Sequence, residues 1–318
     1  MRNCFRLKNF PISFFAPVLG LAGFSLAIQR AQPLLLIPGW VFLGILGITI
    51  ALFALVGIVY ILKLLVFGKE VVKEYQHPVK INFFPLISKT LLVLSVIFLN
   101  LDISVSKWLW IIGVVISTIF SISILGEWIS KEHFKIEHMS PAWFIPVVGN
   151  LIIPIAGVQH FSPEISWFFF SIGIVWMFIL TTIILYRVIF HKQMAEKLVP
   201  TFFILFAAPA IAFIAYYKLT NSFDAFAHIL YYFSAFLFIL IASKWKLFTK
   251  IKFYLSWWAY TFPLAAFTLA TILMFHVTEI YLFKILTAIV LIILTVFVGL
   301  LGALTAKSIR KREICIEE

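Results

Sequence analysis

The string WFIPVVGNLI, residues 143–152, decides the fold, because its proline lies inside a long apolar stretch and the pattern repeats. Similar strings are FFAPVLGLAG at 14–23, NFFPLISKTL at 82–91, LFAAPAIAFI at 205–214 and AYTFPLAAFT at 259–268. Their first prolines recur at intervals of 54 to 68 residues. Self-similarity at a regular interval is typical of a repeated supersecondary unit. The pattern therefore predicts five copies of one helical hairpin.

The composition places these hairpins in a membrane. Of 318 residues, 63% are hydrophobic and 12% are charged, whereas soluble domains have about 45–50% apolar and about 25% charged residues. This excludes a soluble enzyme, a disordered chain and a disulfide scaffold. The apolar runs are continuous, which disfavours a β-barrel with its alternating strands. We expect an all-α membrane protein that forms one transmembrane domain over residues 1–318, with a basic tail at 305–318.

Ten stretches are long and apolar enough to span a bilayer. They are residues 10–29, 35–62, 82–99, 107–127, 141–160, 165–188, 199–217, 224–243, 253–275 and 279–304. Most Lys and Arg residues lie in the two termini or in loops on the same side of the membrane as the termini. The loops on the other side have only Arg30, Lys107 and Lys218. The positive-inside rule then predicts a multi-pass protein with both termini cytoplasmic. The same rule accounts for the net charge of +12, so we expect no nucleic-acid partner.

Prolines divide the ten predicted spans into two classes. Interior prolines fall only in odd-numbered spans, as Pro17, Pro85, Pro146, Pro154, Pro209 and Pro263. Proline leaves a backbone carbonyl unpaired, which a membrane tolerates only against protein or a water-filled path. We therefore expect odd helices inside and even helices facing lipid, with 35–62, 107–127 and 279–304 lacking any polar face. The alternative is that these prolines reflect only the general tolerance of membrane helices for proline.

Chemistry-bearing side chains are scarce within the spans. All 13 acidic residues lie in loops, in tails or at span ends, so we find no proton relay, no metal site and no cofactor site, and we predict that the protein is not an enzyme. Lys89 is the notable interior cation, four residues after Pro85 on the same helix face. It could attract an anion, or it could extend its ammonium group to the interface.

Four segments resemble a known family: residues 10–27 (FPISFFAPVLGLAGFSLA), 69–80 (KEVVKEYQHPVK), 140–150 (SPAWFIPVVGN) and 257–263 (WWAYTFP). They are similar to the TehA-like tellurite-resistance/dicarboxylate transporter family, in the superfamily of the plant guard-cell slow anion channels. The resemblance implies a quasi-fivefold arrangement of hairpins, with odd helices lining a pore and even helices outside. It also implies a homotrimer with a pore in each subunit.

In that family a phenylalanine of the ninth helix closes the pore, and the resemblance places this gate at Phe262. Without the resemblance, Phe262 would be one more packing aromatic among 36 phenylalanines. Pro263 follows it and disfavours helical geometry at the preceding residue. The further pore-lining or kink candidates are Phe14, Pro17, Pro85, Lys89, Pro146, Asn150, Pro209 and Pro263.

The functional hypothesis is a gated anion channel of the bacterial inner membrane. It would pass small monovalent anions such as chloride or nitrate, with no cofactor and with membrane lipid around it. One alternative is a carrier for C4-dicarboxylates such as malate, or a tellurite export protein. A carrier of that kind is expected to have a pair of basic residues at the midplane, and only Lys89 is available. A sensor or scaffold without flux is a third class, but the chain has no sizeable soluble output domain.

Overall fold

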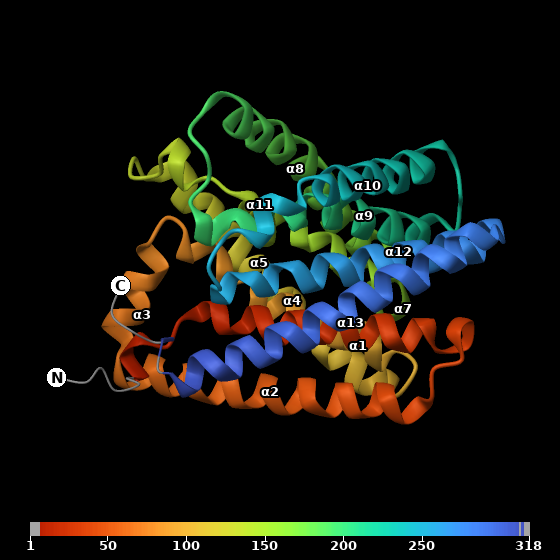
Figure 1. Cartoon of the computed structure of the whole chain (residues 1–318), viewed down its shortest axis with the longest axis horizontal. Helices are drawn as coiled ribbons and strands as arrows, with labels where there is room; N and C mark the ends of the chain where they lie inside the picture. The colour runs from red at the N-terminus through yellow and green to blue at the C-terminus, as the bar shows by residue number, and fades with distance from the viewer. Residues whose placement is uncertain (1–6, 312, 315–318) are drawn as a thin grey trace.

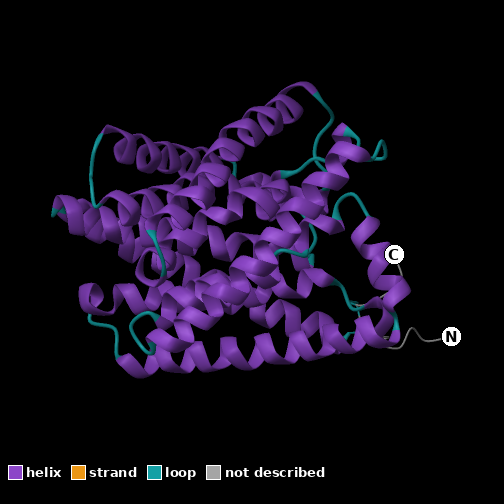
Figure 2. Ribbon diagram, turned by 180° about the vertical axis from the view of Figure 1, so that it is seen from behind, coloured by secondary structure: helices purple, strands orange, loops and turns teal. Residues whose placement is uncertain are grey.

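The computed structural model describes residues 7–311, 313 and 314, and the regular elements in these residues are all helices (Figure 2). Ten helical segments are long and apolar enough to cross a membrane, which confirms the predicted number. They are built from α1 (Phe15–Leu35), α2 (Gly39–Val66), α4 (Leu86–Phe98), α5 (Ile103–Ser130), α6 (Phe144–Val147) with α7 (Ile153–His160), α8 (Pro163–Phe190), α9 (Ile204–Thr220), α10 (Ala225–Ser243), α12 (Thr261–Thr278) and α13 (Tyr281–Arg310). Two short helices, α3 (Gly68–Gln76) and α11 (Trp245–Thr249), lie in connections between spans.

Burial separates the odd spans from the even ones. In the most apolar window of each span, 61–89% of the residues are buried in the odd spans, against 22–33% in the even spans. We call the odd set the inner spans (α1, α4, α6–α7, α9 and α12) and the even set the outer helices (α2, α5, α8, α10 and α13). The predicted division into inside and outside is therefore confirmed.

The inner spans contact one another in a closed ring. Each contacts the next in the order α1, α4, α6–α7, α9 and α12, and α12 contacts α1. Each outer helix packs on the inner span that precedes it in the chain. Figure 1 shows α2 and α8 along opposite edges of the bundle, with α1, α12 and α9 between them. The predicted hairpins are thus present, each with one buried and one exposed member.

Every inner span begins with a 3-10 turn before its α-helix. These turns are η2 (Ile12–Phe14), η3 (Lys80–Phe83), η5 (Pro141–Trp143), η7 (Glu196–Phe203) and η8 (Leu255–Tyr260). Pro17, Pro146 and Pro263 are each the third residue of the α-helix that follows, and Pro85 is the N-cap of α4. A proline in the first turn removes an N–H that would have no helical partner. Most repeat prolines therefore mark the start of an α-helix, and only Pro209 lies deeper within one.

The third inner span is divided into three pieces. Between α6 and α7, residues Val148–Ile152 form the 3-10 segment η6. Pro154 has no N–H, so it cannot bond the carbonyl of Asn150, four residues earlier. A 3-10 segment within a longer helix tightens the turn and changes the direction of its side chains. This local geometry determines where Asn150 points.

The helices α1 and α12 approach closely at two glycines. A Cβ atom on Gly20 would lie 2.0 Å from Thr261 Oγ1, and one on Gly23 would lie 2.9 Å from Phe262 Cδ2. A larger residue at either position would have to displace the side chain of Thr261 or Phe262. The glycine face of α1 therefore helps to set the position of the Phe262 ring.

The outer helix α5 departs from the expectation of an unbroken apolar surface. Its buried face carries Ser106, Ser117 and Ser121, and all three hydroxyl groups form hydrogen bonds. The prediction that span 107–127 lacks a polar face is wrong, because small serines pack among large apolar residues without breaking the hydrophobic run. The last helix, α13, continues to Arg310, past the predicted span end at 304; residues 312 and 315–318 of the predicted tail lie outside the described part of the chain.

A buried ion pair fixes the start of the first inner span. Lys63 Nζ lies 2.6 Å from Glu74 Oε2, and the two side chains are only 3% and 7% exposed. Glu74 also accepts hydrogen bonds from the Ile12 N–H and the Tyr60 hydroxyl, and Lys63 donates to the Phe10 carbonyl. The α2–α3 connection thus holds the chain where it enters α1.

Candidate functional site

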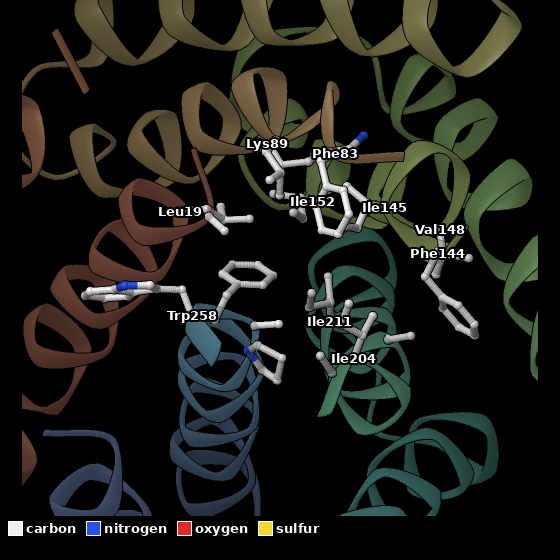
Figure 3. Close-up of a pocket in the computed structure, with 18 residues that line it drawn as sticks. Leu19, Phe83, Lys89, Phe144, Ile145, Val148, Ile152, Ile204, Ile211 and Trp258 are labelled. Atoms are coloured by element: carbon white, nitrogen blue, oxygen red, sulfur yellow. The ribbon is translucent and has the colours of Figure 1, made fainter. Parts of the chain in front are cut away.

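A cavity of about 80 Å³ lies among the five inner spans. One water molecule needs about 10–15 Å³ of such space, so the cavity has room for several particles of that size. Its lining comprises Ala16, Leu19, Phe83, Leu86, Lys89, Phe144, Ile145, Val148, Gly149, Ile152, Ile204, Ala207, Ala208, Ile211, Trp258, Ala259, Phe262 and Pro263. Figure 3 shows these side chains converging from all five inner spans. No outer helix contributes to this lining.

Lys89 is the one charged residue among those that line the cavity. The alternative to an anion-attracting role was that its ammonium group extends to the membrane interface. The side chain is 1% exposed, so it does not do so. The ammonium group donates to Ser117 Oγ at 2.5 Å and to Asn150 Oδ1 at 3.0 Å. In the described part of the chain, no carboxylate lies within ion-pair distance of it. The side chain of Lys89 therefore lines the cavity, while its amino group bonds two neutral partners, Ser117 and Asn150, that lie behind the lining.

The Lys89 side chain lies over a glycine. A Cβ atom on Gly149 would be 2.5 Å from Lys89 Cε and 3.3 Å from its Nζ. Gly149 therefore provides the space through which the alkyl chain reaches Asn150 and α5. In Figure 3 the Lys89 nitrogen lies on the far side of the cavity from Trp258.

Asn150 joins Lys89 to a chain of hydroxyl groups. Its Oδ1 accepts from Lys89 and, at 2.7 Å, from Ser117. Its Nδ2 donates to Ser121 Oγ at 3.1 Å, and Ser121 donates to the Pro146 carbonyl at 2.6 Å. Each polar atom of the asparagine side chain is thus satisfied within the buried interior, as buried polar groups require.

Phe262 lies on the cavity wall and is half-buried, unlike its neighbours Thr261 and Pro263, which are buried. Its ring faces the bare Cα of Gly23 on the neighbouring span α1. The ring therefore occupies space at the seam between the first and last inner spans, next to the cavity.

The structure brings together three of the residues that the sequence singled out, since Lys89, Phe262 and Pro263 all line the cavity. Asn150 lies beside it and reaches it only through Lys89. Phe14, Pro17, Pro85, Pro146 and Pro209 do not line it, and Phe14 stacks on Phe10 with ring centroids 4.4 Å apart. Sequence reasoning missed Ser117, Ser121 and Gly149. The two serines could have been found, because they are four residues apart in a largely apolar helix and therefore lie on one face.

The fold and the cavity define a multi-pass helical membrane protein whose inner spans enclose an apolar space with one buried cation. The chain belongs to the SLAC1 family, because the family model described as "Voltage-dependent anion channel" matches residues 9–306. This is a family of anion channels and transporters and not of enzymes.

Several characterised and uncharacterised relatives are similar over most of the chain. The S-type anion channel SLAH3 of Arabidopsis thaliana is 32% identical over 274 residues, which are 84% of this chain and 43% of that protein. The guard cell S-type anion channel SLAC1 of the same plant is 27% identical over 276 residues, 84% of this chain and 50% of that protein. The uncharacterized transporter MJ0762 of Methanocaldococcus jannaschii is 28% identical over 299 residues, 85% of this chain and 86% of that protein. The chain thus spans about half the length of these two plant relatives.

Proposed function

We propose that this chain is a gated channel for small monovalent anions such as chloride or nitrate. The observation that carries the proposal is the cavity among the inner spans, whose lining is apolar except for Lys89. A single buried cation with neutral hydrogen-bond partners creates a positive potential in a medium of low dielectric constant. Such a potential favours anions and excludes cations. Membership in the SLAC1 family supports the same class of permeant ion.

The charge of the cavity distinguishes this function from the carrier alternatives. A C4-dicarboxylate such as malate carries two negative charges, and its tight binding calls for two cationic partners. The lining contains only Lys89 among its charged residues. A passage with one cation and apolar walls suits weak, transient contact with a monovalent ion, as conduction requires. Export of tellurite has no specific support in the cavity.

The proposed gate is Phe262. Its ring is half-buried, lines the cavity and packs against Gly23, so it lies where a bulky group would narrow a passage between the inner spans. An apolar ring in an apolar constriction excludes water as well as ions. The remaining pore-lining candidates keep supporting roles: Lys89 supplies charge, and the prolines at the starts of the α-helices set the direction of the inner spans.

The assembly and setting are also proposals. The resemblance supports five quasi-equivalent hairpins around a pore and a homotrimer with one pore in each subunit. The exposed surfaces of the outer helices are rich in large apolar side chains such as Leu43, Ile58 and Ile292, which suits contact with lipid. We place the protein in a bacterial inner membrane as part of this proposal, and the distribution of Lys and Arg supports both termini on its cytoplasmic side.

Reconstituted protein tests the proposal. We expect liposomes that contain the Phe262→Ala variant to pass chloride and nitrate in proportion to the driving force, with slower flux for the wild-type protein. Liposomes without protein give the background. Saturable malate exchange with no anion conductance in either protein would support the carrier instead, and absence of any flux in both would refute the channel.

A further inference from the structure

The ammonium group of Lys89 is held by two acceptors that also bond each other. Lys89 Nζ donates to Ser117 Oγ and to Asn150 Oδ1, and Ser117 donates to the same Asn150 oxygen at 2.7 Å. The three groups come from α4, α5 and η6, which are separate in the sequence. This arrangement leaves the ammonium with one fixed position, because each acceptor is itself restrained.

The orientation of Asn150 is set by the broken third inner span. Asn150 lies in η6, the 3-10 segment between α6 and α7. Its Nδ2 donates to Ser121, whose hydroxyl donates in turn to the Pro146 carbonyl. All donors in this chain of bonds point away from Lys89, so the amide presents only its oxygen to the ammonium group. The adjacent Gly149 leaves the space that the lysine alkyl chain occupies.

We propose that Asn150 is a positioning residue for ion selectivity, which holds the Lys89 charge directly behind the cavity wall without neutralising it. A carboxylate at this position would cancel the charge, whereas an apolar side chain would release it into the cavity. A neutral amide oxygen does neither, so the charge acts on permeating anions through space. This inference rests on the proposed channel function and adds the residue that determines where its charge lies.

Two substitutions at one position separate these effects. Asn150→Asp keeps the shape of the side chain and adds a negative charge in contact with Lys89. Asn150→Leu keeps a similar volume, adds no charge and removes both hydrogen-bonding groups. A purely structural role predicts similar defects for the two variants. A positioning role predicts different defects, because the charge is cancelled in one variant and displaced in the other.

The experiment measures currents in planar bilayers under a chloride gradient, with Phe262→Ala as the common background. We expect Asn150→Asp and Lys89→Met each to shift the reversal potential away from the chloride equilibrium potential. We expect Asn150→Leu to keep an anion-selective reversal potential with lower single-channel conductance. Thr118→Ala is the matched control, since Thr118 lies next to Ser117 on α5 but bonds only the Val114 carbonyl, and it should leave the reversal potential unchanged. An Asn150→Asp variant with the parental reversal potential would overturn the inference.

A second measurement does not depend on conduction. In the Lys89→Met background, Asn150→Asp buries a carboxylate without its cation, so we expect a much larger loss of thermal stability than in the parent, where the ion pair forms. Equal losses in the two backgrounds would show that Asn150 and Lys89 do not interact and would overturn the inference. Absence of current in every variant, including Phe262→Ala alone, would refute the channel instead, and the thermal coupling would then decide whether Asn150 holds the charge.

Discussion

Truncation of Phe262 to alanine tests whether its ring closes the passage. The ring lines a cavity of about 80 Å³ and is half-buried, so its removal enlarges a space that already exists. We expect the unfolding free energy to fall by about 1–3 kcal/mol, which corresponds to the transfer term for a phenylalanine without the full cost of a new cavity. The variant should therefore purify as a folded protein.

The same change should raise anion flux by about tenfold or more, which corresponds to at least about 1.4 kcal/mol removed from the barrier. Chloride and nitrate flux into liposomes provides the assay, at equal protein content. Phe206→Ala is the matched control, because Phe206 belongs to another inner span and is 0% exposed. Its ring contacts the rings of Phe238 and Phe267 at centroid distances of 5.5 Å and 6.0 Å.

Phe206→Ala should cost about 3–5 kcal/mol of stability and change flux much less. A Phe262→Ala variant that is well folded and as inactive as the wild-type protein would refute the gate. A variant that fails to fold while Phe206→Ala folds would identify Phe262 as an ordinary packing residue.

Three other predictions concern charge, packing and topology. Glu74→Gln should lower the unfolding free energy by about 3–5 kcal/mol, because it leaves the buried Lys63 without its counter-charge; a matching Lys63→Met change in the same chain should recover part of the loss in thermal unfolding. Gly149→Val should displace the lysine that packs on this glycine and lower anion flux, and equal flux would contradict the close contact. Reporter fusions within 63–80 should read cytoplasmic and those within 101–106 should not, and a cytoplasmic reading for both would contradict the ten-span layout.

The sequence predicts the division into inner and outer helices because a proline within a span leaves a backbone carbonyl without its helical hydrogen bond, and lipid does not tolerate such a group. Pro17 and Pro263 occur in buried spans, and even spans such as α2 have no interior proline and remain largely exposed. Local sequence did not reveal that most of these prolines start an α-helix after a 3-10 turn. Nearly all residues of these stretches are apolar in both the 3-10 turn and the α-helix. The periodicity of hydrophobic residues therefore does not show where the 3-10 turn ends and the α-helix begins.

Only part of the candidate site could be predicted from the sequence in the same way. Lys89 is conspicuous because an interior cation is rare in a membrane span. Its partners are not conspicuous, since Ser117 is 28 residues away on the outer helix of the same hairpin and Asn150 is 61 residues away in the next hairpin. Their association depends on how the hairpins pack, which no local pattern encodes. The proposal that Phe262 is a gate likewise came from the family resemblance, since the residue itself is one of 36 phenylalanines.

The closed ring of inner spans has a consequence for how the chain could be rearranged. Because α12 contacts α1, the last hairpin packs on the first as any other hairpin packs on its neighbour. The contacts around the ring therefore do not require one particular order of the hairpins along the chain. A circular permutant that joins α13 to η1 (Leu7–Asn9) and opens the connection between α5 and η5 would preserve every contact in the ring. Such a protein would show whether the hairpins insert into the membrane as independent modules.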